Sequence, residues 1–230
     1  MPDYKKILSV LEGIKNETYK QGKNFNIPIY QDGKKIALLR PLTKRNLIDN
    51  EKNKKMIRLL KEWREVNSKW FDVFKVTEEG TKRWLREQVI NAEDRILFWV
   101  QTLDGVLIGH MGLYRFDFKN QSCEIDNVIR GRQNIMPGIM TLAQKALMNW
   151  SFSKLEIRAL TLRVFSDNER AIALYHCCGF KKVRDIPLKK VVKGDTIRWV
   201  EISDKSDEKP GRYFSQYKLT KSRNNRINNK

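Results

Sequence analysis

Hydrophobic positions in the N-terminal part of the chain change between helical and strand spacing. Apolar residues recur at intervals of three and four over the first twenty residues, which predicts an amphipathic helix that docks on another surface. The stretch 21–26 is predicted as a linker. Gln31-Asp32-Gly33 is predicted as a turn between two short strands, 27–30 and 35–40.

Two helices follow these strands, and an alternation of strands and helices completes the pattern. The first helix is expected over residues 43–74 and is strongly basic, and the second begins at Thr77, whose hydroxyl can cap it. Asp104-Gly105 lies between two β-rich segments and favours a hairpin. The remaining predicted elements are strands at 95–102, 106–114 and 122–129, a loop at 130–137, a helix from Ile139 to Trp150, a strand at 156–164, a helix at 168–178, and late strands beginning at Phe180 and covering 196–202 and 213–219.

This order of elements predicts an α/β (α+β) fold, because a mixed sheet with helices on both faces buries it best. We divide the chain into an N-terminal helix and linker at 1–24, a main domain at 25–217 and a basic tail at 218–230. The tail is expected to be disordered, since it contains basic residues and no acidic one. The N-terminal helix could act as a lid, an arm or a contact in a homodimer.

The charge balance points to anionic partners. Lys and Arg outnumber Asp and Glu by 46 to 27, and the net charge of +19 favours phosphates, nucleic acid or a membrane surface. A background composition rich in surface lysine explains the same excess without any partner. A nucleic-acid-binding module is one hypothesis, although the sequence contains no helix-turn-helix, zinc or aromatic RNA-binding motif.

Cellular location follows from what the sequence lacks. The longest apolar run, Ile96 to Val100, has five residues and is far too short to span a bilayer, and no signal-peptide pattern is present. Cys123, Cys177 and Cys178 are odd in number, with two adjacent, which suits reduced thiols. We therefore predict a cytoplasmic protein with no membrane span, and no metal site follows from the His and Cys spacing.

The segment around Gly138 carries the first chemical signal. A loop containing Pro137 turns into a helix there, so free N–H groups and the positive end of the helix dipole point outward. Such a helix start can bind a phosphate group. Gly138 has no side chain to obstruct it.

A second motif carries a family resemblance. The residues Asn168-x-x-Ala171-x-x-Leu174-Tyr175-x-x-x-Gly179-Phe180, preceded by Ser166-Asp167, match a conserved block of the GNAT superfamily of acyl-CoA-dependent N-acyltransferases in residue type and spacing. The resemblance extends over about 36–183. It implies a GNAT-like, mostly antiparallel central sheet and acetyl-CoA, or another short acyl-CoA, as cosubstrate.

The same resemblance implies a cofactor site. The family's pyrophosphate loop has the form Gln/Arg-x-x-Gly-x-Gly/Ala, and with Gly138 at its fourth position, Ile135 and Met140 depart from that form. A splayed strand of the family offers a backbone N–H to the thioester carbonyl, and this maps to Val128 or Ile129. The full set of expected cofactor-binding residues is Val128, Ile129, Arg130, Gln133, Asn134, Met136, Pro137, Gly138, Ile139, Asn168, Ala171 and Tyr175.

Acyl transfer to an amine needs a base for the amine and an acid for the departing thiolate. Tyr175 is the acid that the resemblance implies, although a tyrosine here could simply pack in the core. Glu124 and Asp126 share one face of a strand and are the candidate bases. They could equally form salt bridges with the abundant Lys and Arg.

Further similarity suggests the acceptor. Leu39-Arg40-Pro41-Leu42, Leu60-x-x-Trp63-Arg64 and Thr77-x-Glu79 resemble the branch with ribosomal-protein N-terminal acetyltransferases and amino-sugar-nucleotide N-acyltransferases. Glu124 to Gly131 looks more like the enzymes acting on dTDP-linked amino-dideoxyhexoses. We therefore expect a nucleotide-linked deoxyamino sugar, used in surface polysaccharide (lipopolysaccharide) biosynthesis, as acceptor. Trp63, Arg64 and Tyr114 are its expected contacts, and a protein N-terminal or small-molecule amine acetyltransferase is the alternative.

Overall fold

A nine-stranded sheet forms the centre of the described part of the protein. The structure is a computed structural model that describes residues 4–19, 25–203 and 208–221. The strand order is β1-β2-β3-β4-β5-β6-β9-β7-β8, and every neighbouring pair is antiparallel except β5 and β6. The strands are β1 (Ile27–Gln31), β2 (Lys34–Pro41), β3 (Ile96–Thr102), β4 (Leu107–Asp117), β5 (Ser122–Arg130), β6 (Ala159–Phe165), β7 (Lys181–Lys193), β8 (Thr196–Glu201) and β9 (Arg212–Thr220).

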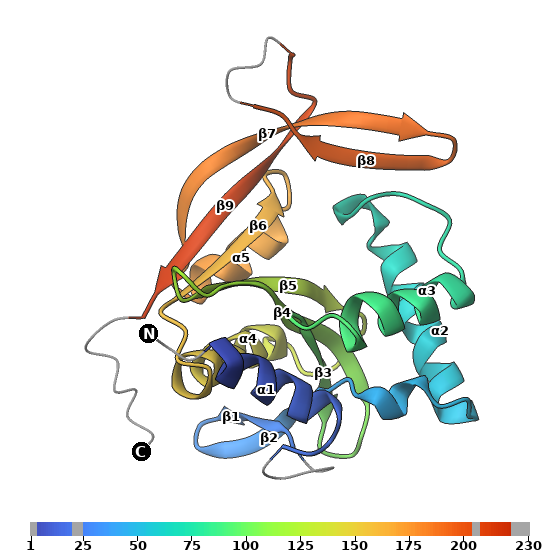
Figure 1. The fold of residues 1–230 in the computed structure, drawn as a ribbon, viewed down its shortest axis with the longest axis vertical. Coiled ribbons are helices and arrows are strands. Elements are labelled where there is room, and N and C mark those ends of the chain that lie inside the picture. Colours follow the sequence, from blue (N-terminus) through green and yellow to red (C-terminus); the bar gives the residue numbers. More distant parts are fainter. Residues whose placement is uncertain (1–3, 20–24, 204–207, 222–230) are drawn as a thin grey trace.

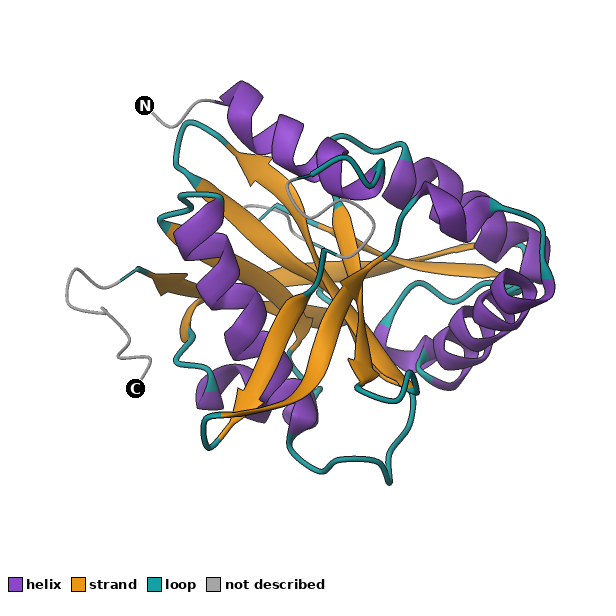
Figure 2. Cartoon of the chain, turned by 90° about the horizontal axis from the view of Figure 1, so that it is seen from below, coloured by secondary structure: helices purple, strands orange, loops and turns teal. Residues whose placement is uncertain are grey.

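Helices cover both faces of the sheet, as the sequence predicts (Figure 2). Helices α1, α4 and α5 lie on one face, and α2 with the π-helical turn η4 lies on the other. None of the described helices is long and apolar enough to cross a bilayer. The helical elements are α1 (Tyr4–Lys15), the 3-10 turn η2 (Lys44–Leu47), α2 (Glu51–Val66), the 3-10 turn η3 (Ser68–Trp70), α3 (Glu78–Trp84), η4 (Leu85–Ile90), α4 (Ile139–Lys154) and α5 (Glu169–Cys177).

Strand β3 shows why each face of the sheet has its own core. Ile96, Phe98 and Val100 belong to a cluster with α1 and α4, whereas Leu97 and Trp99 belong to a second cluster with α2 and η4. Successive strand residues point to opposite faces, so one continuous apolar run can serve two cores. Each of these five side chains is at most 1% exposed.

The N-terminal helix docks within this molecule. Ile7, Leu11 and Ile14 recur on one face of α1 and are buried in the same cluster as Ile29 of β1 and Leu147 of α4. The predicted linker falls largely on residues 20–24, and with them the 24/25 domain boundary lies outside the described residues.

The sheet opens between β5 and β6. These parallel strands pair only at Ser122 with Ala159, Cys123 with Leu160 and Glu124 with Thr161, and then diverge. On its other side, β5 shifts register against β4 at the positions opposite His110 to Gly112. The bulge lies at Asn127, whose φ of 50° is a left-handed conformation that asparagine tolerates better than most residues.

A long hairpin extends above this opening (Figure 1). The first half of β7 pairs with β9, and its second half pairs with β8 across the Gly194-Asp195 turn. The segment 67–73 after α2, here called the strap, pairs with this hairpin. Val73 and Ile197 exchange two backbone hydrogen bonds of 2.8 Å.

Among the expected boundaries that differ from the structure are those of the basic helix, of the strand after residue 156 and of the tail. The helix predicted at 43–74 is broken into η2, α2 and η3, because Asn50 caps α2 by accepting from the Asn53 N–H at 2.9 Å and Asn67 ends it. The strand predicted from residue 156 begins at Ala159, since Glu156 has a φ of 56°.

The third difference concerns the basic tail. Strand β9 continues to Thr220 and pairs with both β6 and β7, so residues 218–220 are part of the sheet. The expected tail was wrong at these three positions. Its residues 222–230 lie outside the described part of the chain.

Candidate active site

A cleft of about 1140 Å³ occupies the opening between β5 and β6. Its walls come from β5, the start of α4, the turn from β6 into α5, the strap and β8. Gly138, Thr141 and Ala171 line the part beside the start of α4, here called the α4 end, and Trp70 and Trp199 line the part beside the strap and β8, here called the strap end. A cleft at the point where neighbouring strands separate is a common location for a binding site.

The start of α4 forms one wall of the cleft. Gly138 precedes the helix with a φ of 79°, and no atom lies within 4 Å of the position that a Cβ would occupy there. The positive end of the helix dipole lies behind this open position, although the Ile139 N–H already donates to the Met136 carbonyl oxygen at 3.1 Å and the Thr141 N–H to that of Gly138 at 3.0 Å. This arrangement fits the predicted phosphate site.

Arg130 organises the loop that leads to this helix. Its guanidinium donates to the carbonyl oxygens of Gln133 at 2.8 Å and Ile135 at 2.7 Å, and also to those of Arg132 and Met136. Arg170 at the start of α5 donates to the Gln133 side chain. Two arginines thus lie at this end of the cleft, where the phosphates of coenzyme A would need positive charge.

The predicted cofactor residues fall into two groups. Val128, Ile129, Arg130, Gly138, Asn168, Ala171 and Tyr175 line the cleft, whereas Gln133, Asn134, Met136, Pro137 and Ile139 do not. Ile139 is 1% exposed and packs in the core. Asn168 acts as the cap of α5, because its Oδ1 accepts from the Ala171 N–H at 3.2 Å.

Tyr175 is both a packing residue of the core and part of the cleft wall. It belongs to the core cluster and contacts the Phe180 ring edge to face, yet it also lines the cleft. Burial raises the pKa of the Tyr175 phenol well above its usual value, with Asp126, Cys178 and Glu124 adding to the effect. The phenol is therefore protonated at neutral pH and can act as an acid.

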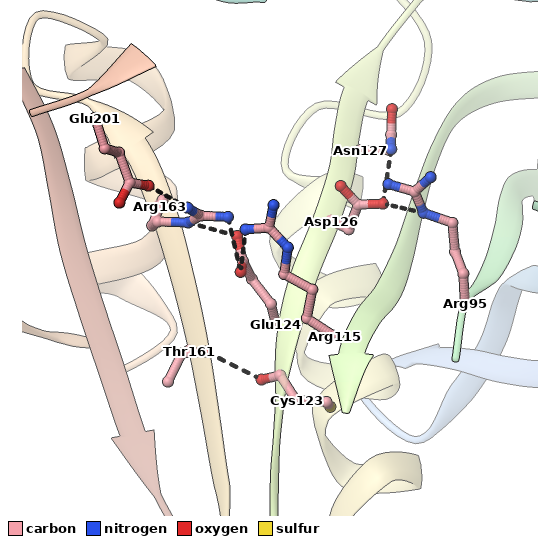
Figure 3. Close-up of polar contacts among 9 residues, drawn as sticks. All are labelled: Arg95, Arg115, Cys123, Glu124, Asp126, Asn127, Thr161, Arg163 and Glu201. Atoms are coloured by element: carbon pink, nitrogen blue, oxygen red, sulfur yellow. Dashed lines mark hydrogen bonds and ion pairs between the residues drawn. The ribbon is translucent and has the colours of Figure 1, made fainter. Parts of the chain in front are cut away.

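Glu124 lies at the last paired position of β5, where the two strands separate (Figure 3). Its carboxylate accepts from Arg163 of β6 at 3.1 and 3.2 Å and from Arg115 at 3.4 Å. Arg163 also pairs with Glu201 of β8 at 2.5 Å. Burial raises the pKa of Glu124 to about 7, with Asp126 and Glu201 contributing and Arg115 opposing.

Asp126 lies two residues further along the same face of β5. It accepts from Arg95 at 2.9 Å and from Asn127 at 2.7 Å (Figure 3). The Arg95 guanidinium lies 3.9 Å from the centroid of the Tyr114 ring. Both predicted carboxylates are thus in the cleft, and both also form the ion pairs that the sequence left open.

His110 is a buried residue that supports the bulge in β5 from the core and does not itself line the cleft. Its Nδ1 lies 2.7 Å from the Asn127 carbonyl oxygen, and its ring stacks on Trp63. Burial lowers the pKa of His110 to about 4, so the ring is neutral and Nδ1–H donates to that carbonyl. The bond holds the bulge beside the cleft.

The three expected acceptor contacts have different positions. Arg64 lines the cleft, whereas Trp63 and Tyr114 do not. Trp63 is 6% exposed and packs so closely on Gly131 that a Cβ on that glycine would lie 1.9 Å from the indole ring. Trp63 therefore has a packing role.

Sequence reasoning missed the residues that the strap and β8 bring to the cleft. Trp70, Phe71, Arg198 and Trp199 line it, together with Arg163 of β6. No local pattern marks these residues, because they come together only when the strap pairs with β8 across more than a hundred residues of sequence. The hydrophobic pattern of a single segment cannot indicate such a contact.

Comparison with known proteins identifies the family of the chain. Residues 38–181 match the family model described as acetyltransferase (GNAT) domain. No curated protein sequence is significantly similar to the chain. Among solved structures, spermidine N-acetyltransferase from Vibrio cholerae in complex with CoA and spermine has 18% identity, a TM-score of 0.60 and coverage of 80% of this chain and 95% of that one.

A dodecameric form of the Vibrio cholerae enzyme has 16% identity and a TM-score of 0.55, with coverage of 80% of this chain and 93% of that one. At this level of identity the likeness shows the fold. The family model covers well over half of the chain. The chain therefore belongs to the GNAT acetyltransferase family and is an acyl-CoA-dependent N-acyltransferase.

Proposed function

We propose that this protein transfers an acetyl group from acetyl-CoA to the amine of a small molecule bound at the strap end of the cleft. The observation that carries the proposal is the separation of β5 and β6 beyond Glu124. It places the start of α4, Tyr175 and the two carboxylates of β5 around one cleft.

In this proposal, separate residues of the chain act as base, as oxyanion donor and as acid. Bound acetyl-CoA supplies an activated thioester. Glu124 accepts a proton from the acceptor amine, directly or through water, because its pKa of about 7 matches a base that works near neutral pH. The backbone N–H of Val128 or Ile129, beyond the bulge, stabilises the oxyanion.

Tyr175 completes the reaction by returning a proton to the leaving thiolate. Transfer of a phenol proton to a thiolate of pKa near 8.5 is uphill, so it accompanies cleavage of the carbon–sulfur bond, and the phenolate then regains a proton from solvent or from protonated Glu124. The raised pKa of Tyr175 keeps the phenol protonated until that step.

The acceptor in this proposal is a nucleotide-linked deoxyamino sugar. Arg64, Arg198 and Trp199 at the strap end offer positive charge and an aromatic surface, which suit phosphates and a nucleobase. A second candidate is a polyamine, since the enzymes from Vibrio cholerae act on spermidine. The carboxylates Glu124 and Glu201 would attract such a cation.

The experiment is the release of free thiol from acetyl-CoA with dTDP-amino sugars, spermidine and an N-terminal peptide as separate acceptors. Mass spectrometry then identifies the acetylated product. We expect release with a small-molecule amine and none with the peptide. Absence of release with every acceptor, together with no stabilisation of the protein by coenzyme A, would contradict the proposal.

A further inference from the structure

Arg64 differs from the other arginines of the cleft in its electrostatic partners. Arg115, Arg163 and Arg198 lie within 4.0 Å of a carboxylate, and Arg130 and Arg170 lie at the α4 end of the cleft. Within the part of the chain that the structure describes, no carboxylate lies within 4.0 Å of the Arg64 guanidinium. The carboxylates of Asp72 and then Asp126 lie farther away, and both partly oppose the lowering of the Arg64 pKa by burial.

The surroundings of Arg64 are aromatic, and its side chain is half-buried. Its guanidinium lies 3.9 Å from the centroid of Phe71 and 5.4 Å from that of Phe74. It donates a long hydrogen bond of 3.4 Å to the Asp72 carbonyl oxygen. Burial lowers the pKa of Arg64 to about 10, so the group is still charged at neutral pH. A partly buried charge with no carboxylate within 4.0 Å is only partly compensated, and an anion that reaches it gains a strong charge-assisted bond.

The position of Arg64 is fixed by the strap. Phe71 and Asp72, which contact it, precede the two backbone hydrogen bonds between Val73 and Ile197. Arg212 of β9 donates to the Lys69 carbonyl oxygen at 3.1 Å, which ties the other end of the strap to the sheet. The guanidinium is therefore held in place before an acceptor binds, which lowers the entropic cost of recognition.

We infer that the acceptor carries an anionic group, a phosphate or a carboxylate, near its amine, and that Arg64 binds this group while the amine faces Glu124 and Asp126. This inference rests on the proposed function and names the charge pattern of its substrate. It separates this protein from the spermidine enzymes that share its fold, because a polyamine would place a second cation beside Arg64.

The test uses four primary amines of similar size: O-phosphoethanolamine, β-alanine, ethanolamine and putrescine. We expect acetylation of one or both anionic amines with kcat/KM at least roughly tenfold above ethanolamine and putrescine. The phosphate and carboxylate arms distinguish the two sources of negative charge. Arg64→Met should remove this preference by raising KM for the anionic acceptor, with the KM for acetyl-CoA unchanged.

Two variants make the result specific to the guanidinium. Arg64→Lys keeps the charge but loses the two-pronged geometry, so we expect only partial recovery of the preference. Arg58→Met removes an exposed arginine of the same helix that pairs with Glu78 at 3.4 Å and does not line the cleft, and it should behave as the wild type.

A binding measurement separates failure of the inference from failure of the proposed function. With the protein saturated with coenzyme A, dTDP should bind to the wild type and to Arg58→Met, and roughly tenfold or more weakly to Arg64→Met. Preference for putrescine, or equal dTDP binding by wild type and Arg64→Met, would overturn the inference while leaving an acetyltransferase. Failure of coenzyme A itself to bind would instead overturn the proposed function.

Discussion

At the scale of single residues, the site depends on how burial changes proton affinity. Glu124 and Tyr175 line the same cleft, and burial is the largest cause of the rise in pKa of both. Burial brings the pKa of the carboxyl group close to neutral pH and moves the pKa of the phenol further above it. The carboxyl group can therefore accept a proton near pH 7, while the phenol stays protonated.

The acid role of Tyr175 predicts the effect of Tyr175→Phe. The variant keeps the ring that packs against Phe180, so the fold and the affinity for coenzyme A should change little. Turnover should fall roughly 100-fold, the lower end of general acid catalysis. Steady-state kinetics and calorimetric binding of coenzyme A measure the two effects separately, and unchanged turnover would remove Tyr175 as the acid.

The base role of Glu124 predicts a pH profile. Below its pKa of about 7 the carboxyl is protonated and cannot accept a proton, so kcat/KM should fall as pH decreases through that value. Glu124→Gln should lower the rate roughly 100-fold and abolish this limb. A limb near pH 7 that persists in the variant would show that another group, such as the acceptor amine, titrates there.

At the scale of elements, the start of α4 is a clear case of local structure that the sequence specifies. Pro137-Gly138 before an apolar run predicted the helix, and the structure has it, with open space beside Gly138. The hairpins, the capped α5 and the apolar strand β3 were predictable for the same reason, since each depends on neighbouring residues. Sequence patterns could not predict the strap, its contact with β8 or the bulge at Asn127, because these features depend on pairings between distant segments.

The helix start predicts different effects for two substitutions of equal size. Gly138→Asn and Gly138→Asp both add a side chain at a φ of 79°, into a position with no atom within 4 Å. Asparagine tolerates this conformation and is neutral, so coenzyme A binding should weaken only modestly. Aspartate adds a negative charge where the phosphates would bind. The affinity of Gly138→Asp for coenzyme A should therefore be lower than that of Gly138→Asn by roughly tenfold or more.

Isothermal titration with coenzyme A measures this difference, and thermal unfolding confirms that both variants are folded. Equal affinities in folded Asn and Asp variants would mean that the phosphates lie elsewhere. Increasing salt should reduce the difference in coenzyme A affinity between the two variants, because salt screens the repulsion between the aspartate and the phosphates.

At the scale of the whole molecule, Arg212 connects the parts that enclose the acceptor end of the cleft. Its guanidinium pairs with Asp167 at 2.8 Å, donates to the Lys69 carbonyl oxygen and lies 3.5 Å from the centroid of Phe165. It thereby joins β9, the turn before α5 and the strap. The acceptor end of the cleft depends on a contact outside the matched family region, since β9 follows residue 181.

Arg212→Met should therefore affect stability and acceptor binding together. We expect a loss of roughly 1–3 kcal/mol in the free energy of unfolding. The KM for the acceptor should rise more, relative to wild type, than the KM for acetyl-CoA. Arg184→Met, which removes an exposed arginine of β7 bonded to Gln216, is the control and should change stability by less than about 0.5 kcal/mol. An acceptor KM that is unchanged in the Arg212 variant would show that the strap does not shape the acceptor site.

The short pairing between β5 and β6 has one more consequence. Beyond Glu124 each strand has a partner on its outer side only, so two backbone edges face each other inside the molecule. An unpaired edge accepts any extended chain with amide groups, and coenzyme A carries two amides in its flexible arm. A cosubstrate bound in the cleft would then continue the hydrogen-bond ladder from β5 to β6. The two halves of the sheet would resist local opening more strongly when the cosubstrate concentration is high.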